Sequence, residues 1–196
     1  MTLASLLTLP LSGHVAGVPE NWSMNDRRDA VQLAHQFQNT CRHGVNWTPK
    51  TTVHLIPASK HSDAYESEAK RLSTDRRPTL DRTVAPSSTP RSTVAEPIGY
   101  AIEKLGFHGT LNRNIESIIK DGFRKPQAHG NHGAAIYTHR TASYSHDFAF
   151  IGGDQTHLEI FGCVVLAFSG ELFGDIYAVV DPARVRTLLV FKYPRQ

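Results

Sequence analysis

The apolar stretch at residues 161–168 (FGCVVLAF) is the feature that most limits the folds open to this chain. A continuous apolar run of this length predicts a strand. Shorter strand-like patterns lie at residues 134–138, 177–180 and 187–193, and residues 51–56 (TTVHLI) alternate apolar and polar side chains. The chain is therefore expected to build a sheet from these segments.

Helical spacing occurs in three other segments. Residues 25–41 repeat apolar side chains on one helical face, with Asn25 as the expected N-cap, and residues 62–72 show the same spacing. A third helix is expected to begin after Asn112 or Asn114 and to end at Gly122, because glycine tolerates the turn that closes many helices. Helices that are segregated from strands in this way predict an α+β fold.

Composition restricts the class of protein further. The 196 residues carry a net charge of only +3, so we expect no nucleic-acid partner. No run of eighteen apolar residues exists, so we expect no membrane span and no membrane partner. Cys41 and Cys163 are too few for a disulfide framework. They are interpreted as thiols of a reducing compartment, cytoplasmic or nuclear, with a single bridge between them as the alternative.

Two segments differ from the rest of the chain. Residues 1–17 lack Asp, Glu, Lys and Arg and are expected to be an N-terminal extension, with a cleaved signal as the alternative. Residues 73–97 hold four Pro, four Ser, five Thr and no aromatic residue. Such an insert buries too little apolar surface to offset its ordering entropy, although a regulatory or partner-docking loop is the alternative. Residues 18–196 are expected to form one domain that contains this insert.

A candidate binding site starts at His108-Gly109, where a strand-like segment meets the third helix. Because glycine has no side chain, its backbone N–H and C=O groups stay accessible to an amide-bearing ligand. Asn114 and Arg124 follow His108 by six and sixteen residues, so both can approach a phosphate or a ribose.

A second group of motifs follows the first. Tyr137 lies in the segment GAAIY, and Ser145 follows it by eight residues, with aromatic side chains nearby at Tyr144, Phe148 and Phe150. The order HGT, KDGF, IY and this serine resembles the catalytic domain of the poly(ADP-ribose) polymerase-like ADP-ribosyltransferases. The segments VPENWS at residues 18–23, FQNTC at 37–41 and DPARV at 181–185 are similar to the mono-ADP-ribosylating, macrodomain-linked members.

The resemblance implies one ADP-ribosyltransferase domain with split β-sheets, mixed or antiparallel, whose flanking helices form an NAD cleft. NAD would be the substrate, no metal would be needed, and proteins would accept the ADP-ribose. Gly109 would hold the nicotinamide carboxamide with help from Ser145, and His108 would bind the adenosine-side ribose. Tyr137 would cover one face of the nicotinamide, and Phe148 or Phe150 the other. Further contacts with NAD are expected from Thr110, Asn114, Arg124 and Tyr144.

A third catalytic position, after His108 and Tyr137, separates chain growth from single transfer in the family that the sequence resembles. Polymerising members carry a glutamate there, and matching the DPARV segment puts Ile176 at this position. An isoleucine cannot accept a hydrogen bond from ribose, so the resemblance implies mono-ADP-ribosylation, with acidic acceptor side chains assisting. A shift of one residue would put Asp175 there instead, because adjacent strand residues face opposite sides of a sheet. Ala135, where the family usually has glycine, is a second departure.

Two other functions compete with this interpretation. An RNA 2′-phosphotransferase shares the NAD-binding fold, but the small positive charge gives it little support. A non-catalytic module that binds NAD or ADP-ribose is favoured by the missing glutamate and opposed by the presence of His108 and Tyr137. A further cluster of histidines has no common zinc-site spacing, and its members are expected to be solvated: His129, His132, His139 and His146.

Overall fold

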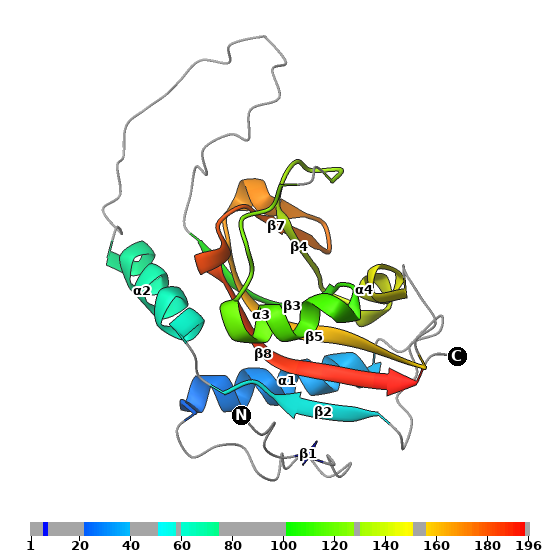
Figure 1. The fold of residues 1–196 in the computed structure, drawn as a ribbon. Coiled ribbons are helices and arrows are strands. Elements are labelled where there is room, and N and C mark those ends of the chain that lie inside the picture. Colours follow the sequence, from blue (N-terminus) through cyan, green and yellow to red (C-terminus); the bar gives the residue numbers. More distant parts are fainter. Residues whose placement is uncertain are drawn as a thin grey trace.

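The computed structural model describes residues 6–7, 22–39, 51–57, 60–74, 101–127, 130–150 and 156–194 (Figure 1). The predicted extension at residues 1–17 lies outside the described residues except for residues 6–7, and the predicted insert at 73–97 lies outside them except for 73–74. No helix among the described residues is long and apolar enough to cross a membrane.

The strands form one sheet in the order β1-β2-β8-β5-β3-β4-β7-β6, and every neighbouring pair is antiparallel. The bounds of the strands are Leu6–Leu7 (β1), Thr52–Leu55 (β2), Ile102–Gly109 (β3), Ile136–His139 (β4), His157–Ala167 (β5), Leu172–Phe173 (β6), Ile176–Val179 (β7) and Val185–Pro194 (β8).

The sheet divides between β3 and β4. β3 pairs with β5 along its whole length, from Ile102 opposite Ala167 to Gly109 opposite Ile160, whereas β3 and β4 share a single pair, Phe107 opposite His139. Beyond that pair the edges of β3 and β4 are not joined. The predicted α+β fold with a split sheet is therefore confirmed, and all of its described strand pairs are antiparallel.

Four α-helices accompany the sheet: α1 (Met24–Asn39), α2 (Lys60–Thr74), α3 (Ile115–Asp121) and α4 (Ala142–Phe150). Three short 3-10 turns join other elements: η1 (Asn112–Asn114), η2 (Ser169–Glu171) and η3 (Pro182–Arg184). Asn114 lies at the N-cap of α3 but makes no capping side-chain bond, and Gly122 closes this helix with a φ of 74°.

The predicted N-cap of the first helix is wrong by two residues. Ser23 Oγ accepts a hydrogen bond from the backbone N–H of Asp26 at 3.1 Å, and Asp26 Oδ2 accepts one from the backbone N–H of Ser23 at 3.2 Å. This reciprocal pair satisfies N–H groups that a helix start leaves open. Asn25 therefore lies inside α1, and Cys41 lies outside the described residues.

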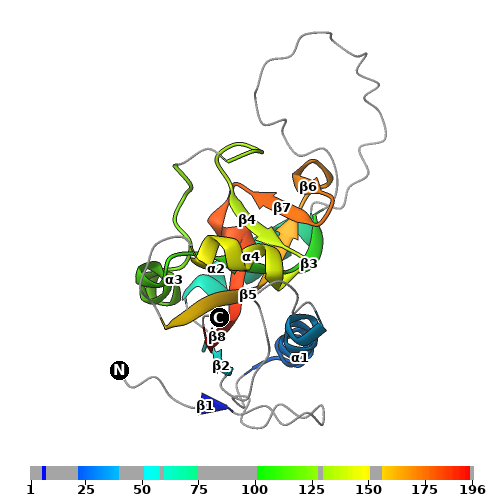
Figure 2. The same ribbon diagram turned by 90° about the vertical axis from the view of Figure 1, so that its right-hand side faces the viewer.

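β5 has buried residues on both of its faces, which explains its uninterrupted apolar sequence. Ile160 and Val164 belong to a core that includes Phe37 of α1 and Ala142 of α4, and Phe161 and Val165 belong to a second core. The second core includes one residue of α3, Ile115. Figure 2 shows α1 and α3 on opposite sides of β5 and β8, so the sheet lies between two layers of helices.

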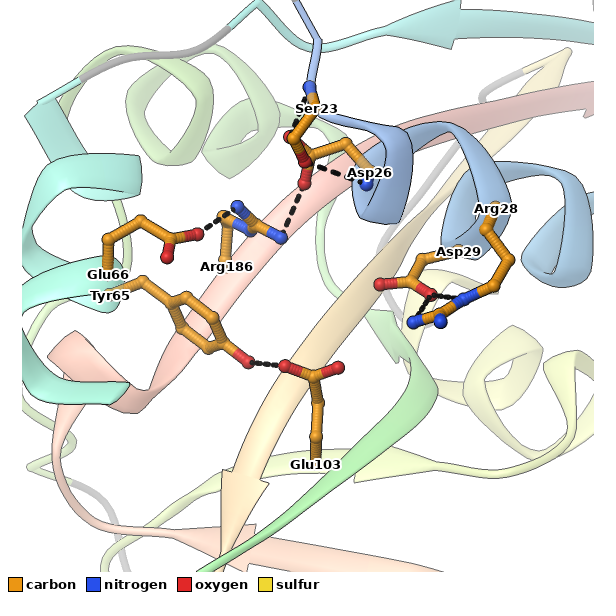
Figure 3. Close-up of polar contacts among 8 residues, drawn as sticks. All are labelled: Ser23, Asp26, Arg28, Asp29, Tyr65, Glu66, Glu103 and Arg186. Carbon is orange, nitrogen blue, oxygen red and sulfur yellow. Dashed lines mark hydrogen bonds and ion pairs between the residues drawn. The ribbon is translucent and has the colours of Figure 1, made fainter. Parts of the chain in front are cut away.

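A cluster of ionic and aromatic side chains ties α1 and α2 to the sheet (Figure 3). Arg186 of β8 lies 2.6 Å from Asp26 of α1 and 2.8 Å from Glu66 of α2, and its guanidinium lies over the Tyr65 ring at 4.8 Å. The Tyr65 hydroxyl donates to Glu103 of β3 at 3.0 Å. Arg186 therefore ties α1 and α2 to its own strand, β8, and Tyr65 links α2 to β3. We call these five residues the Arg186 cluster: Asp26, Tyr65, Glu66, Glu103 and Arg186.

Candidate functional site

A hollow of about 160 Å³ lies where β4 separates from β3, and α4 closes one side of it. Most of its lining is apolar surface. The lining residues are His108, Gly109, Ala135, Tyr137, Thr138, His139, Tyr144, Ser145, Phe148 and Ile176.

Gly109 ends β3 in very close contact with α4. A Cβ atom at this position would lie 1.8 Å from the backbone oxygen of Ser145, so no other residue fits without moving the strand or the helix. Ser145 Oγ donates to the Phe107 carbonyl at 2.8 Å. Backbone groups alternate between the two edges of a strand, so Gly109 directs its N–H and C=O to the same edge as Phe107. Because Gly109 lines the hollow, these two groups border it.

The His108 ring is held in one orientation. Its Nδ1 lies 2.7 Å from the carbonyl oxygen of Tyr137, and because a carbonyl only accepts, Nδ1 carries the hydrogen. Burial lowers the pKa of His108, against the opposing effect of this hydrogen bond. The ring is therefore neutral near pH 7, and Nε2 is an acceptor. Such a nitrogen is suited to accept a hydrogen bond from a sugar hydroxyl.

Tyr137 of β4 lines the hollow and also holds the preceding loop. Its hydroxyl donates to the Gly133 carbonyl at 2.7 Å and accepts from the His132 N–H at 2.9 Å. A Cβ atom on Gly130 would lie 2.7 Å from the Tyr137 ring, so glycine permits this close approach. The loop and the ring thus form one wall, and His132 stacks on Phe173 of β6 at 3.8 Å between ring centroids.

Two aromatic side chains of α4 lie at the hollow and remain accessible. Tyr144 is 41% exposed and Phe148 is 46% exposed, so both rings can be reached by a ligand. The Phe150 side chain, the other predicted stacking partner, lies outside the described residues. Of the two predicted stacking partners, Phe148 is thus the one that the structure describes at the hollow, and a flat aromatic ligand suits such walls.

The structure places Ile176, and not Asp175, on the wall of the hollow. Ile176 is the first residue of β7 and pairs with His139 of β4. Asp175 lies in the preceding turn, where its carboxylate is 3.5 Å from the Arg140 guanidinium and its carbonyl accepts from the Arg140 N–H at 2.9 Å. The polar groups of Asp175 are thus directed to Arg140.

Three of the predicted site residues are not part of the lining. Asn114 Nδ2 donates to Thr110 Oγ1 at 3.0 Å, so these two side chains bind each other at the start of α3. Arg124 lies 4.0 Å from Asp121, and its side chain is 82% exposed. Their predicted contacts with NAD stay predictions.

The structure also corrects the interpretation of the histidine cluster. His139 lies at the end of β4 and lines the hollow, and His146 is buried against the Tyr193 hydroxyl at 3.0 Å. His129 lies outside the described residues. The sequence does contain a signal for the position of His139. His139 follows Tyr137 by two residues, and alternate residues of a strand face the same side, so both side chains lie on one side of β4. Within the described part of the chain, no group of three or more His, Cys, Asp or Glu side chains is arranged to hold a metal ion.

Comparison with protein families identifies the family of this chain. Residues 33–189 match the sequence profile of the poly(ADP-ribose) polymerase catalytic domain, a stretch that includes α1 from Leu33 onward, the whole hollow and β8 as far as Leu189. A search among curated protein sequences finds no match.

Proposed function

The chain belongs to the poly(ADP-ribose) polymerase catalytic domain family of NAD-dependent ADP-ribosyltransferases, and from this premise we propose that it transfers a single ADP-ribose from NAD to acidic side chains of proteins. Nicotinamide would occupy the hollow between β3 and β4. The observation that carries the proposal is that Gly109, the Tyr137 and Phe148 rings and the apolar Ile176 line one hollow.

The hollow offers each part of nicotinamide a matching group. The carboxamide carries one acceptor and two N–H donors, and the N–H and C=O of Gly109 complement both. The Tyr137 and Phe148 rings lie at the hollow, where they cover the faces of a flat ring. Ser145 Oγ donates to Phe107, so its oxygen keeps a lone pair for the carboxamide N–H.

His108 would bind a ribose hydroxyl of NAD through Nε2, because Nδ1 is already used by the Tyr137 carbonyl. Breaking the bond between nicotinamide and ribose creates positive charge on the ribose carbon. Binding of both halves of NAD against rigid elements favours this step through orientation, and the enclosing aromatic walls keep water away from the nicotinamide side.

Ile176 is the reason to propose single transfer. Its side chain accepts no hydrogen bond, so a ribose hydroxyl of an already attached ADP-ribose would find no carboxylate on β7 to activate it. An acidic acceptor side chain brings its own negative charge to the ribose carbon. For this reason acidic acceptors are favoured over alcohols.

Ile176 also supports a second candidate function, that of a module that binds NAD or ADP-ribose without cleaving it. Incubation of the purified chain with labelled NAD and mixed proteins separates the candidates. We expect discrete labelled bands that a His108→Ala variant lacks. A ladder of lengthening chains would contradict single transfer, and NAD binding without nicotinamide release would support the binding module.

A further inference from the structure

His139 has a place in the hollow that its role in the fold does not explain. It is the last residue of β4, lies directly opposite Ile176 in the pairing of β4 with β7, and lines the hollow. The ring stacks on Tyr144 of α4 with a centroid distance of 4.3 Å and an angle of 18° between the planes. A polar ring is thus held beside the apolar residue at the third catalytic position.

The hydrogen bonds of His139 decide which nitrogen carries its hydrogen. The backbone N–H of Thr141 donates to Nδ1 at 2.9 Å, so Nδ1 is an acceptor. In the neutral ring the hydrogen then lies on Nε2. Among the residues that the structure describes, no partner for Nε2 is present. The ring therefore has an N–H group left to donate to a molecule in the hollow.

Two charged side chains lie near this ring. Burial lowers the pKa of His139, and the negative charge of the nearby Asp175 opposes this effect only in part. Arg140 lies 3.5 Å from Asp175. The negative charge of Asp175 is therefore partly offset by a neighbouring cation. An anion in the hollow would therefore meet the N–H donor of His139, beside a carboxylate that is already paired with Arg140.

Transfer to an ionised carboxylate needs no base. One oxygen of the ionised carboxylate forms a bond to the ribose carbon while the bond from that carbon to nicotinamide breaks. The electron pair of the broken bond goes to the nicotinamide nitrogen, which becomes neutral, and the product is a neutral ester. No proton is released, whereas attack by water or by an alcohol does release one.

We infer that His139 binds the acceptor: its Nε2–H holds one oxygen of an ionised aspartate or glutamate side chain, and the other oxygen attacks the ribose carbon. The inference rests on the proposed transferase function and adds to it the residue that selects the acceptor. Ile176 supplies an apolar surface beside His139. The oxygen of the carboxylate that attacks the ribose carbon therefore has no hydrogen-bond donor from Ile176.

The test compares two peptides that differ only in one side chain, glutamate in one and glutamine in the other. The measured quantity is the ratio of ADP-ribosylated peptide to nicotinamide released. His139→Phe keeps a ring to stack on Tyr144 and removes the N–H donor, whereas His139→Gln restores a donor. His35→Phe, at an exposed position of α1 away from the hollow, is the matched control.

For the glutamate peptide we expect the ratio to fall about 10-fold or more in His139→Phe, because a hydrogen bond to a charged group is lost. The ratio should recover at least in part in His139→Gln and stay at the wild-type value in His35→Phe. An equal ratio in the wild type and His139→Phe, or no advantage of glutamate over glutamine in the wild type, would overturn the inference. Release of no nicotinamide at all would instead overturn the proposed function.

Discussion

The Arg186 cluster and the hollow between β3 and β4 both gather polar and aromatic side chains, but they use them in opposite ways. In the cluster, Arg186 is paired with Asp26 and Glu66, and the Tyr65 hydroxyl is paired with Glu103 (Figure 3). In the hollow, one nitrogen of His108 and one of His139 are bound to the backbone, and the other nitrogen is left to a ligand.

This difference separates stability from function. The cluster joins α1 and α2 to the sheet across long sequence distances, so its removal should act on folding. The hollow exists because β3 and β4 share only one residue pair, and its free backbone and ring nitrogens add little to the folded state. Changes at the two regions should therefore have separable effects.

The largest effect is expected from Gly109→Ala, because the hollow depends on the contact of β3 with α4. The added methyl group would lie 1.8 Å from the Ser145 backbone oxygen, so one of the two elements must move. We expect a loss of at least about 3 kcal/mol in the free energy of unfolding and loss of nicotinamide release. The measurement is urea unfolding followed by an activity assay on the folded fraction.

Gly170→Ala is the matched control for this change. A Cβ atom at Gly170 would have no heavy atom within 4 Å. Its free energy of unfolding should stay within about 1 kcal/mol of the wild type. Equal behaviour of the two variants would show that β3 and α4 are not in the close contact described.

Arg186→Met should come next and should act on stability alone. The substitution leaves the buried Asp26 carboxylate without its cation, which is destabilising. Glu66, the other partner of Arg186, loses less because its side chain is 64% exposed and is hydrated instead. We expect a cost of about 2–3 kcal/mol in the free energy of unfolding, with nicotinamide release by the folded fraction retained. Arg71→Met, which breaks an exposed pair with Glu68, should cost under about 1 kcal/mol. Loss of nicotinamide release in the folded Arg186→Met variant would contradict the claim that the Arg186 cluster acts on stability alone.

His108→Ala should show the reverse of Arg186→Met. It removes the nitrogen that we expect to bind ribose, and the loss of such an orienting contact should lower kcat/KM for nicotinamide release about 100-fold. Stability should fall by about 1 kcal/mol, since one hydrogen bond to the Tyr137 carbonyl disappears. A variant that unfolds as readily as Gly109→Ala would instead assign His108 a structural role.

The smallest effect concerns pH. Burial lowers the pKa of four histidines in the folded chain: His54, His108, His139 and His146. Below the ordinary histidine pKa of about 6.5 the unfolded chain then binds more protons than the folded chain, so stability falls as pH falls. Urea unfolding should show a free energy lower by about 1 kcal/mol or more at pH 5.5 than at pH 7.5. A free energy that rises on acidification would contradict the buried neutral rings.

The sequence predicts those features that depend on local pattern. The apolar run at residues 161–168 predicts a buried strand, and these residues are buried in and next to β5. The helix α4, which carries Ser145 to the hollow, is not among the predicted helices. The preference for Ile176 over Asp175 comes from the family resemblance, through the DPARV segment, and Ile176 is the one of the two that lines the hollow.

Other features arise from contacts that local pattern does not contain. The single pair between β3 and β4 depends on how β5 and β7 hold their neighbours, and this is a property of the whole sheet. The position of Ser23 as N-cap depends on its reciprocal bonds with Asp26, which compete with the equally plausible Asn25. The sequence predicts a solvated His139, whereas the pairing of β4 with β7 holds this residue opposite Ile176 at the hollow.

The most direct measurement of the central claim is a crystal structure of the chain soaked with nicotinamide. We expect the ring in the hollow between Tyr137 and Phe148, with its carboxamide paired to the N–H and C=O of Gly109. Nicotinamide bound at another place, or an empty hollow at a saturating concentration, would contradict the assignment of this hollow as the site where NAD is cleaved.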